Sequence, residues 1–319
     1  MPLATPITDL FDIRHPVLLA PMAGASGGAL AAAVTAAGGL GLIAGGYGDA
    51  DQLDAEFETA GNARVGVGFI TWSLARQPAL LTQTLERAPA AVFLSFGDAA
   101  PFARDIHGAG AKLICQVQGV EQARIAAGIG ADAIVAQGSE AGGHGASRGT
   151  FALVPAVVDA VTPLPVLAAG GIGDGRGLGA SLLLGAAGAV IGTRFLATTE
   201  CLWPESFKQR LLEHGGDDTL RTSLFDRLRG LDWPPEFTGR VIRNASVERW
   251  QATPPAPGDD ADTARRDYDS AAATDADVRA LHAGEILDLI DTVIPAAELV
   301  EKIVVQAEAE LARTASLAT

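Results

Sequence analysis

The stretch PVLAAGGIGDGRGLGASLLLGAAGAVIGTRF, residues 165–195, shows the unit from which the fold of this chain is predicted. Two short apolar runs, 165–169 and 189–193, flank an Ala- and Leu-rich segment at 175–188 that has helical spacing. The apolar runs are continuous rather than alternating, as in strands that are buried on both faces of a parallel sheet. Each run leads into glycine. The stretch therefore predicts a strand–helix–strand unit with Gly-rich strand ends.

Apolar runs of this kind recur through the first two thirds of the chain. They lie at 17–20, 40–44, 65–70, 91–95, 112–117, 132–136, 165–169 and 189–193. Ala-rich segments with helical spacing separate most of them, and the segment at 49–62 has the weakest pattern. Eight strands are the number that a closed (β/α)8 TIM barrel needs, so this barrel is the predicted fold. An open, doubly wound sheet gives the same local pattern and is the alternative.

The chain changes character after residue 202. Residues 1–202 are expected to form the barrel, and residues 203–319 a C-terminal, mostly helical appendage over the substrate region. Residues 251–277 are polar and acidic and contain proline, so a long loop or lid is expected there. Pro295 is expected to begin a final helix that packs back on the barrel.

The charge and composition of the chain argue against several classes of protein. The net charge is −15, with 23 Lys and Arg against 38 Asp and Glu. Nucleic acids and anionic membranes bind through clustered Lys and Arg, so neither is an expected partner. The N-terminus lacks a basic start followed by an apolar core, and no window reaches the ~18 apolar residues of a membrane span. The 2 cysteines do not make a disulfide framework. A cytoplasmic location is therefore expected.

Glycines at the ends of the seventh and eighth apolar runs predict a phosphate site. Gly170 and Gly171 follow the seventh run, and Gly192 and Thr193 close the eighth. In such barrels the chemistry lies where strands end, and the last two strands frequently hold a phosphate. Glycine lets backbone N–H groups face an anion, and Thr193 adds a hydroxyl. Turn glycines without a ligand are the alternative explanation.

Other strand ends supply a glycine, two glutamine amides and a methionine thioether. Met22 follows the first run, Gly68 lies in the third, and Gln116 and Gln118 lie at the fifth. These residues suit a flat ligand that ends in phosphate, so flavin mononucleotide (FMN) is the expected cofactor, with Met22, Gly68 and Gln116 among its contacts. The 5 histidines are spread along the sequence without metal-ligand spacing, so no metal is expected. No G-x-S-x-G elbow of a serine hydrolase is present.

The stretch AQGSEAGGHGAS, residues 136–147, brings an ionisable ring to the end of the sixth run. Gln137 is expected at the barrel mouth, where it can hydrogen-bond a planar ring, and Gly142 lets the chain approach that ring closely. His144 follows the glycines, and a histidine can take or give a proton near neutral pH. It is therefore the candidate catalytic residue, whereas Glu140 is expected to cap a helix or to support the residues that contact the ligand.

Four motifs, in this order, resemble the nitronate monooxygenases, once called 2-nitropropane dioxygenases. They are APMAG at 20–24, AQGSEAGGHGA at 136–146, AAGGIGDGRG at 168–177 and VIGTRFLATTE at 190–200. The resemblance implies an FMN-dependent barrel that oxidises alkyl nitronates with O2 to a carbonyl compound and nitrite. It implies that His144 is the catalytic histidine. The implied flavin contacts are Met22, Gln137 and Gly142, and the implied phosphate contacts are Gly170, Gly171, Gly192 and Thr193.

One position departs from the family pattern. Many members carry Asn where this chain has Gly68, so an amide that could hold flavin or substrate is missing, and Thr71 and Gln116 are the candidates to replace it. NAD(P)H-dependent reduction of quinones or enoyl thioesters, known from related flavin barrels, is the alternative function. A flavin- or phosphate-binding barrel without turnover is a third. A small-molecule substrate and O2 are the expected partners, and a homodimer is left open.

Overall fold

The barrel predicted from the sequence is closed by its first and second strands. The computed structural model describes residues 3–250 and 259–317, and its main sheet has the order β1-β9-β8-β6-β5-β4-β3-β2, all parallel. Leu40 bridges Leu18 and exchanges backbone hydrogen bonds with Val17 and Leu19, which joins the two ends of the sheet. The open doubly wound alternative is therefore wrong. The strands are β1 (Val17–Leu19), β2 (Leu42–Gly46), β3 (Gly66–Ile70), β4 (Ala91–Ser95), β5 (Lys112–Val117), β6 (Ala133–Gln137), β8 (Val166–Ala169) and β9 (Gly188–Ile191).

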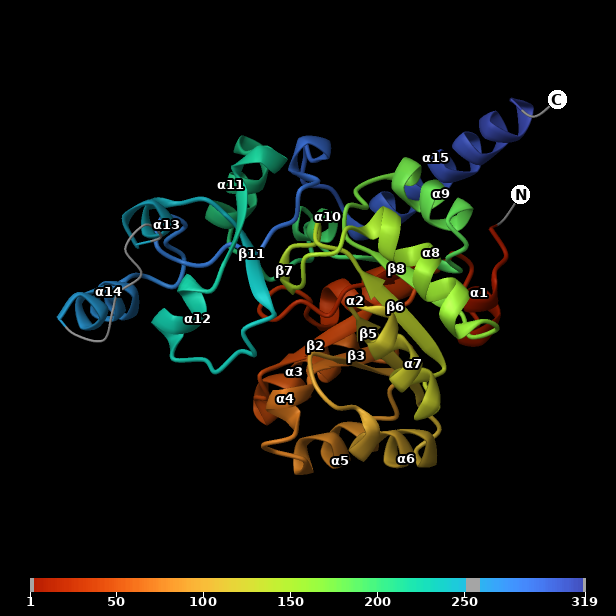
Figure 1. Cartoon of the computed structure of the whole chain (residues 1–319), viewed down its shortest axis with the longest axis horizontal. Helices are drawn as coiled ribbons and strands as arrows, with labels where there is room; N and C mark the ends of the chain where they lie inside the picture. Colours follow the sequence, from red (N-terminus) through yellow and green to blue (C-terminus); the bar gives the residue numbers. More distant parts are fainter. Residues whose placement is uncertain (1–2, 251–258, 318–319) are drawn as a thin grey trace.

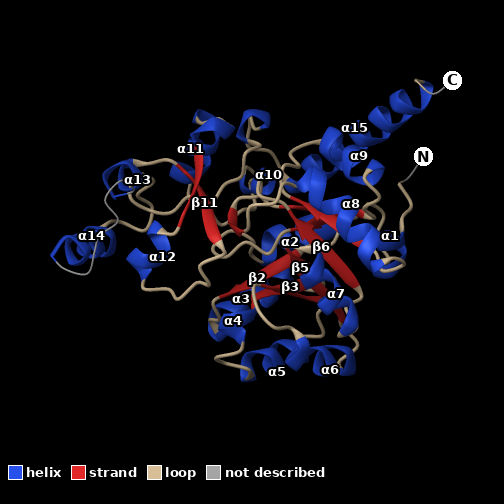
Figure 2. Cartoon of the chain, viewed as in Figure 1, coloured by secondary structure: helices blue, strands red, loops and turns tan. Residues whose placement is uncertain are grey.

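Helices surround these strands (Figure 2). The weak segment at 49–62 forms a regular helix, because Leu53, Phe57 and Ala60 give it a buried stripe and the Asp49 side chain caps its first turn. The helices of the barrel are α1 (Pro6–Phe11), α2 (Gly28–Ala36), α3 (Ala50–Ala60), α4 (Thr71–Leu74), α5 (Ala79–Glu86), α6 (Ala100–Gly108), α7 (Val120–Gly128), α8 (Thr150–Val161), α9 (Gly175–Leu183) and α10 (Thr193–Leu196).

Two apolar layers explain why the strand sequences are continuously apolar. Val17 and Leu19 face the layer between strands and helices, whereas Leu18 belongs to the interior of the barrel. Ile7 and Phe11 of α1 pack into that interior at the end where the strands begin. The bottom of the barrel is thus filled with side chains, and a ligand can enter only at the opposite rim.

The appendage contains a small sheet as well as helices (Figure 1). Its order is β10-β11-β7, antiparallel, and β7 (Gly143–Gly145) comes from the loop after β6. Leu224, Phe225 and Val241 belong to a separate apolar cluster beneath it. The expectation of a mostly helical appendage missed this sheet, and the domain division at residue 202 stays a prediction. The elements are α11 (Glu205–Glu213), β10 (Thr219–Thr222), α12 (Leu224–Arg229), β11 (Thr238–Ile242), α13 (Ala245–Trp250), α14 (Asp259–Ser270) and α15 (Ala296–Ser316).

The expectation of a loop at 251–277 is wrong for residues 259–270. Residues 251–258 lie outside the described residues, but α14 runs from Asp259 to Ser270. Ala264 and Tyr268 are four residues apart and both buried in the small apolar cluster, so this polar helix has an apolar side that packs on the appendage. Among the described residues, no helix has the length and apolar character needed to cross a bilayer.

The last helix packs back on the barrel, with Pro295 preceding its first turn. Helix α15 lies against α9 and α2, with Leu299, Ile303 and Ala307 among its buried residues. Its C-terminal end projects beyond the barrel (Figure 1). Close packing depends on glycine in α9, because a Cβ at Gly175 would lie 2.3 Å from the backbone nitrogen of Ala307.

We expect Gly175→Ala and Gly179→Ala to have opposite effects on stability. A Cβ at Gly179 would meet nothing closer than 3.7 Å, so alanine there should add up to about 1 kcal/mol through helix propensity. At Gly175 the clash with α15 should lower the free energy of unfolding by about 1–3 kcal/mol. Urea unfolding of both variants and the wild type measures this. Equal stability of the two variants would contradict the close packing of α15 on α9.

Candidate active site

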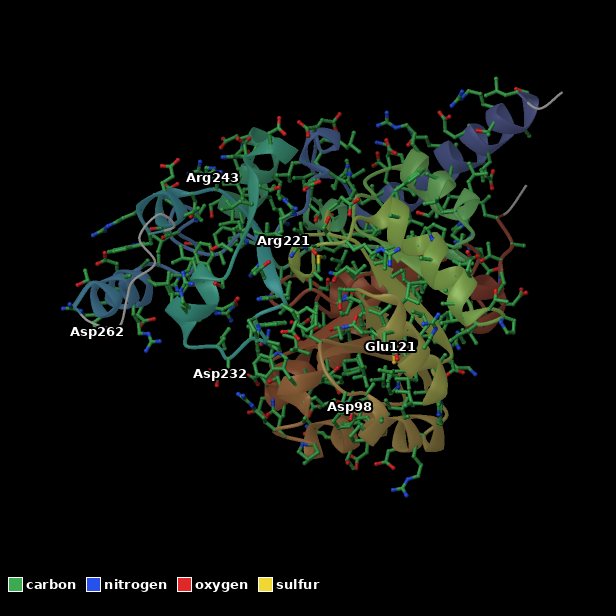
Figure 3. All side chains as sticks on the ribbon, viewed as in Figure 1. Asp98, Glu121, Arg221, Asp232, Arg243 and Asp262 are labelled. Carbon is green, nitrogen blue, oxygen red and sulfur yellow. The ribbon has the colours of Figure 1, made fainter. Side chains whose placement is uncertain are left out.

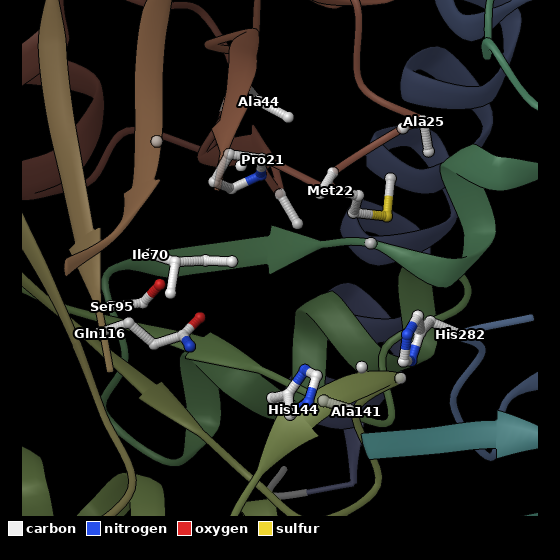
Figure 4. A pocket seen from close by; sticks show the side chains of 18 of the residues that line it. Pro21, Met22, Ala25, Ala44, Ile70, Ser95, Gln116, Ala141, His144 and His282 are labelled. Carbon is white, nitrogen blue, oxygen red and sulfur yellow. The ribbon is translucent and has the colours of Figure 1, made fainter. Parts of the chain in front are cut away.

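A pocket of about 530 Å³ opens at the rim where the barrel strands end (Figure 4). Its volume falls in the range of about 300–1,000 Å³ that is typical of small-molecule sites. Every site residue predicted from the sequence lies on its wall, so the fold brings together residues from six strand ends. They are Met22, Gly68, Gln116, Gln137, Gly142, His144, Gly170, Gly171, Gly192 and Thr193. The roles assigned to them stay predictions.

Four backbone N–H groups on one wall have no partner within the described chain. Gly170 and Gly171 have φ of +96° and +74°, a region that favours glycine, and their N–H groups make no backbone hydrogen bond to another described residue. The same holds for the N–H groups of Gly192 and Thr193 on the neighbouring strand end. The Thr193 hydroxyl accepts a hydrogen bond of 3.0 Å from the Gly284 N–H. Unpaired donors beside one pocket fit a bound phosphate, and turn geometry alone does not require them.

Three glutamines form a network behind His144. Gln137 accepts hydrogen bonds from the side-chain nitrogens of Gln116 (3.2 Å) and Gln118 (2.9 Å), and donates one to the His144 carbonyl (3.1 Å). Gln137 therefore fixes the backbone that carries His144. The Gln116 carbonyl oxygen has no partner among the described residues, and the side chain projects into the pocket (Figure 4). It is free to accept a hydrogen bond from a ring N–H.

Position 68 has no room for a side chain in this arrangement of the chain. A Cβ at Gly68 would lie 2.2 Å and 2.4 Å from the Cγ and Cβ of Pro21, so the Pro21 ring fills the space of that side chain. Of the two candidates to replace the missing amide, Gln116 lines the pocket. Thr71 is buried, and its hydroxyl has no partner among the described residues.

The appendage encloses His144 on two sides. His144 lies on β7, which pairs with β11, and only 8% of the residue is exposed. Its Nε2 is 3.0 Å from each carboxylate oxygen of Asp226 on α12, and its ring stacks on Trp233 with 3.4 Å between centroids and 2° between planes. Neither Asp226 nor Trp233 is among the site residues expected from the sequence. Both residues lie far from His144 along the chain, so the sequence near position 144 does not indicate these contacts.

Trp233 is itself held by aromatic residues of the barrel rim. Its indole N–H donates a 3.0 Å hydrogen bond to the Tyr47 hydroxyl, and its ring meets Trp72 and Phe96 edge-on. Burial raises the pKa of Tyr47, so this hydroxyl stays protonated near neutral pH. Arg229 lies over the Tyr47 ring and lines the pocket, where its charge can attract an anion.

Two arginines hold the loop that carries His144. Arg221 and Arg240 each donate a 3.0 Å hydrogen bond to the Ser139 carbonyl, and Arg221 belongs to β10 of the small sheet (Figure 3). Burial, with the nearby charge of Arg240, lowers the pKa of Arg221 to about 10. Glu140 accepts hydrogen bonds from the N–H and hydroxyl of Thr150 and thus caps α8, as expected. In residues 3–250 and 259–317, no group of three or more His, Cys, Asp or Glu is placed to hold a metal ion.

His282 is a second imidazole on the pocket wall that the sequence analysis did not select. Its ring centroid is 5.6 Å from that of His144, and its buried Nδ1 has no partner among the described residues. Burial, and then the nearby His144 and Arg229, lower the pKa of His282 to about 3. The ring is therefore neutral near pH 7.

We expect Gly68→Ala to lower the free energy of unfolding by about 1–3 kcal/mol, because the new methyl overlaps Pro21. The double variant Pro21→Ala/Gly68→Ala should recover part of this loss, so the two effects would not add. Urea unfolding and the amount of flavin retained after purification measure both. A Gly68→Ala protein as stable as the wild type would contradict the steric explanation.

Neutral His282 should make the stability depend on pH. Its folded pKa of about 3 lies below the ordinary 6.5, so this contribution is complete above pH 6.5 and is lost as the pH falls toward 3. His282→Phe cannot take up the proton, so its free energy of unfolding should fall less steeply below pH 6.5, by up to ~1.4 kcal/mol per pH unit. His282→Asn should give the same slope despite its smaller volume. Variants that keep the wild-type slope would contradict this assignment.

Similar proteins agree with the fold and identify the family. The sequence matches the family model of nitronate monooxygenase over residues 4–64 and 76–306. A nitronate monooxygenase of Metarhizium robertsii, npaC, is 37% identical over 261 residues, which cover 72% of this chain and 73% of that protein.

Other similar proteins carry different names. The (3aS,4S,5R,7aS)-5-hydroxy-7a-methyl-1-oxo-octahydro-1H-indene-4-carboxyl-CoA dehydrogenase of Mycobacterium tuberculosis is 36% identical over 257 residues, covering 79% of this chain and 70% of that protein. The structure of FabK from Thermotoga maritima aligns with a TM-score of 0.85 and 30% identity over 98% of this chain and 99% of that one. On the family match and these identities, the chain belongs to the nitronate monooxygenase family of flavin-dependent oxidoreductases.

Proposed function

We propose that the chain is an FMN-dependent enzyme that oxidises alkyl nitronates with O2 to a carbonyl compound and nitrite. The observation that carries the proposal is the position of His144, which lines the same pocket as the four unpaired backbone N–H groups. The family match and the relative named a nitronate monooxygenase support it. A small organic molecule and O2 are the proposed partners.

The residues on the pocket wall fit FMN. The N–H groups of Gly170, Gly171, Gly192 and Thr193 would hold the phosphate, since they have no backbone partner among the described residues. Gln116 offers a free carbonyl oxygen to the ring system. The transfer of electrons from the substrate to O2 is the chemistry that FMN supplies when bound.

His144 would act on the substrate in two ways. With a neutral nitroalkane, the imidazole takes the α-proton, the C–H bond breaks, and its electron pair passes into the nitro group to form the nitronate. With a preformed nitronate, no C–H bond has to break, and the ring needs only to orient the anion. Arg229 on the pocket wall favours such an anionic substrate.

A second candidate function is the NAD(P)H-dependent reduction of an enoyl thioester or quinone. The relative named a carboxyl-CoA dehydrogenase supports this candidate, because its name gives that protein a CoA-linked substrate. In that reaction, NAD(P)H would be the electron donor, the enoyl thioester or quinone would be the acceptor, and both would bind in the same pocket.

Anaerobic mixing distinguishes the two candidates. We expect purified protein to take up FMN, and its flavin absorbance to bleach with an alkyl nitronate but not with NADH or NADPH. Admission of O2 should then restore the absorbance and yield nitrite. Rapid bleaching by a pyridine nucleotide alone would favour the reductase, and a folded protein that binds no FMN would contradict both.

A further inference from the structure

The contact between His144 and Asp226 determines which ring nitrogen carries the hydrogen. Asp226 belongs to α12 in the appendage, and its two carboxylate oxygens are each 3.0 Å from Nε2 of His144. The exposed fraction of both side chains is 7%, so little water competes for this contact. Two acceptor oxygens at equal distance from one nitrogen are satisfied by a shared N–H. A protonated carboxyl that donated to a bare Nε2 would leave its other oxygen facing the nitrogen lone pair.

The plane of the ring is fixed by a different contact. Trp233 stacks on the imidazole with 2° between the ring planes, and the Tyr47 hydroxyl holds the indole N–H. Asp226 thus restricts rotation within the plane, and Trp233 restricts tilt. With both in place, the ring has one orientation.

The remaining nitrogen is open to the pocket. Nδ1 of His144 has no hydrogen-bond partner among the described residues and is not among their fully buried unpaired atoms. His144 lines the pocket, and its imidazole projects toward the space near Gln116 (Figure 4). A ring with hydrogen on Nε2 presents a lone pair on Nδ1 to this space.

We propose that Asp226 is the positioning residue of this site, which keeps His144 in the Nε2–H form so that Nδ1 exchanges a proton with the substrate. The proposal rests on the proposed function for the identity of the substrate. In the nitroalkane reaction, the α-proton passes to Nδ1, the C–H electron pair goes to the nitro group, and the ring becomes an imidazolium. The carboxylate of Asp226 stabilises that cation without taking the proton.

Asp226→Asn tests the proposal, because an amide can donate to Nε2 and hold the ring in the wrong tautomer. We expect kcat on a neutral nitroalkane to fall by about 10²–10⁴-fold, the range that acid–base catalysis contributes. Turnover of the preformed nitronate should change much less, since no C–H bond breaks. Asp226→Glu, which keeps the carboxylate, should restore part of the nitroalkane activity.

Asp232→Asn is the matched control. Asp232 lies next to Trp233, but its side chain is 85% exposed and pairs with Arg76 outside the pocket. It should leave both activities unchanged. Equal losses on nitroalkane and nitronate in Asp226→Asn, with no rescue by Asp226→Glu, would overturn the positioning role and indicate a structural one.

A spectroscopic measurement separates this proposal from the proposed function. In protein labelled with 15N-histidine, the signals lost in His144→Gln identify this ring at a pH where it is neutral. We expect hydrogen on Nε2 in the wild type and a shift toward Nδ1–H in Asp226→Asn. Hydrogen on Nδ1 in the wild type would overturn the role of Asp226 whatever the substrate is. A wild type that oxidises neither substrate would refute the proposed function and leave the tautomer result decisive for Asp226.

Discussion

The structure depends on one constraint, the closure of eight parallel strands by the backbone hydrogen bonds between Leu40 and β1. Parallel strands in a closed ring must all end at the same rim. The interior is filled with apolar side chains, and α1 packs into the opposite end, so the rim is where a ligand can approach. Closure thus gathers residues as far apart in sequence as Met22 and Thr193 around one pocket.

The appendage and the barrel together hold the loop and the ring of His144. Pairing of β7 with β11 makes the loop after β6 part of a second sheet, and Arg221 and Arg240 hold that loop through the Ser139 carbonyl. His144 therefore belongs to both parts of the molecule. Its peptide is fixed from the barrel side by Gln137, and its ring from the appendage side. A ring held from both sides has a defined orientation before any substrate arrives.

Glycine serves two different purposes in this chain. At Gly170 and Gly171 the backbone takes positive φ and leaves its N–H groups unpaired, which suits an anion site. At Gly68 and Gly175 glycine instead makes room for a neighbour, the Pro21 ring in one case and the backbone of α15 in the other. At position 68 the Pro21 ring thus fills the space that a side chain would need.

The sequence by itself determined the barrel, because strands buried on both faces read as continuous apolar runs, and it placed the candidate site at the strand ends. It also distinguished His144, whose surrounding glycines are local. Only the tertiary structure decided the partners of that imidazole. Asp226 and Trp233 lie far from His144 along the chain, and nothing in the sequence around them indicates that they contact it. The α14 helix was missed for the same reason: Ala264 and Tyr268, which pack in the small apolar cluster, gain a partner surface only after the appendage folds.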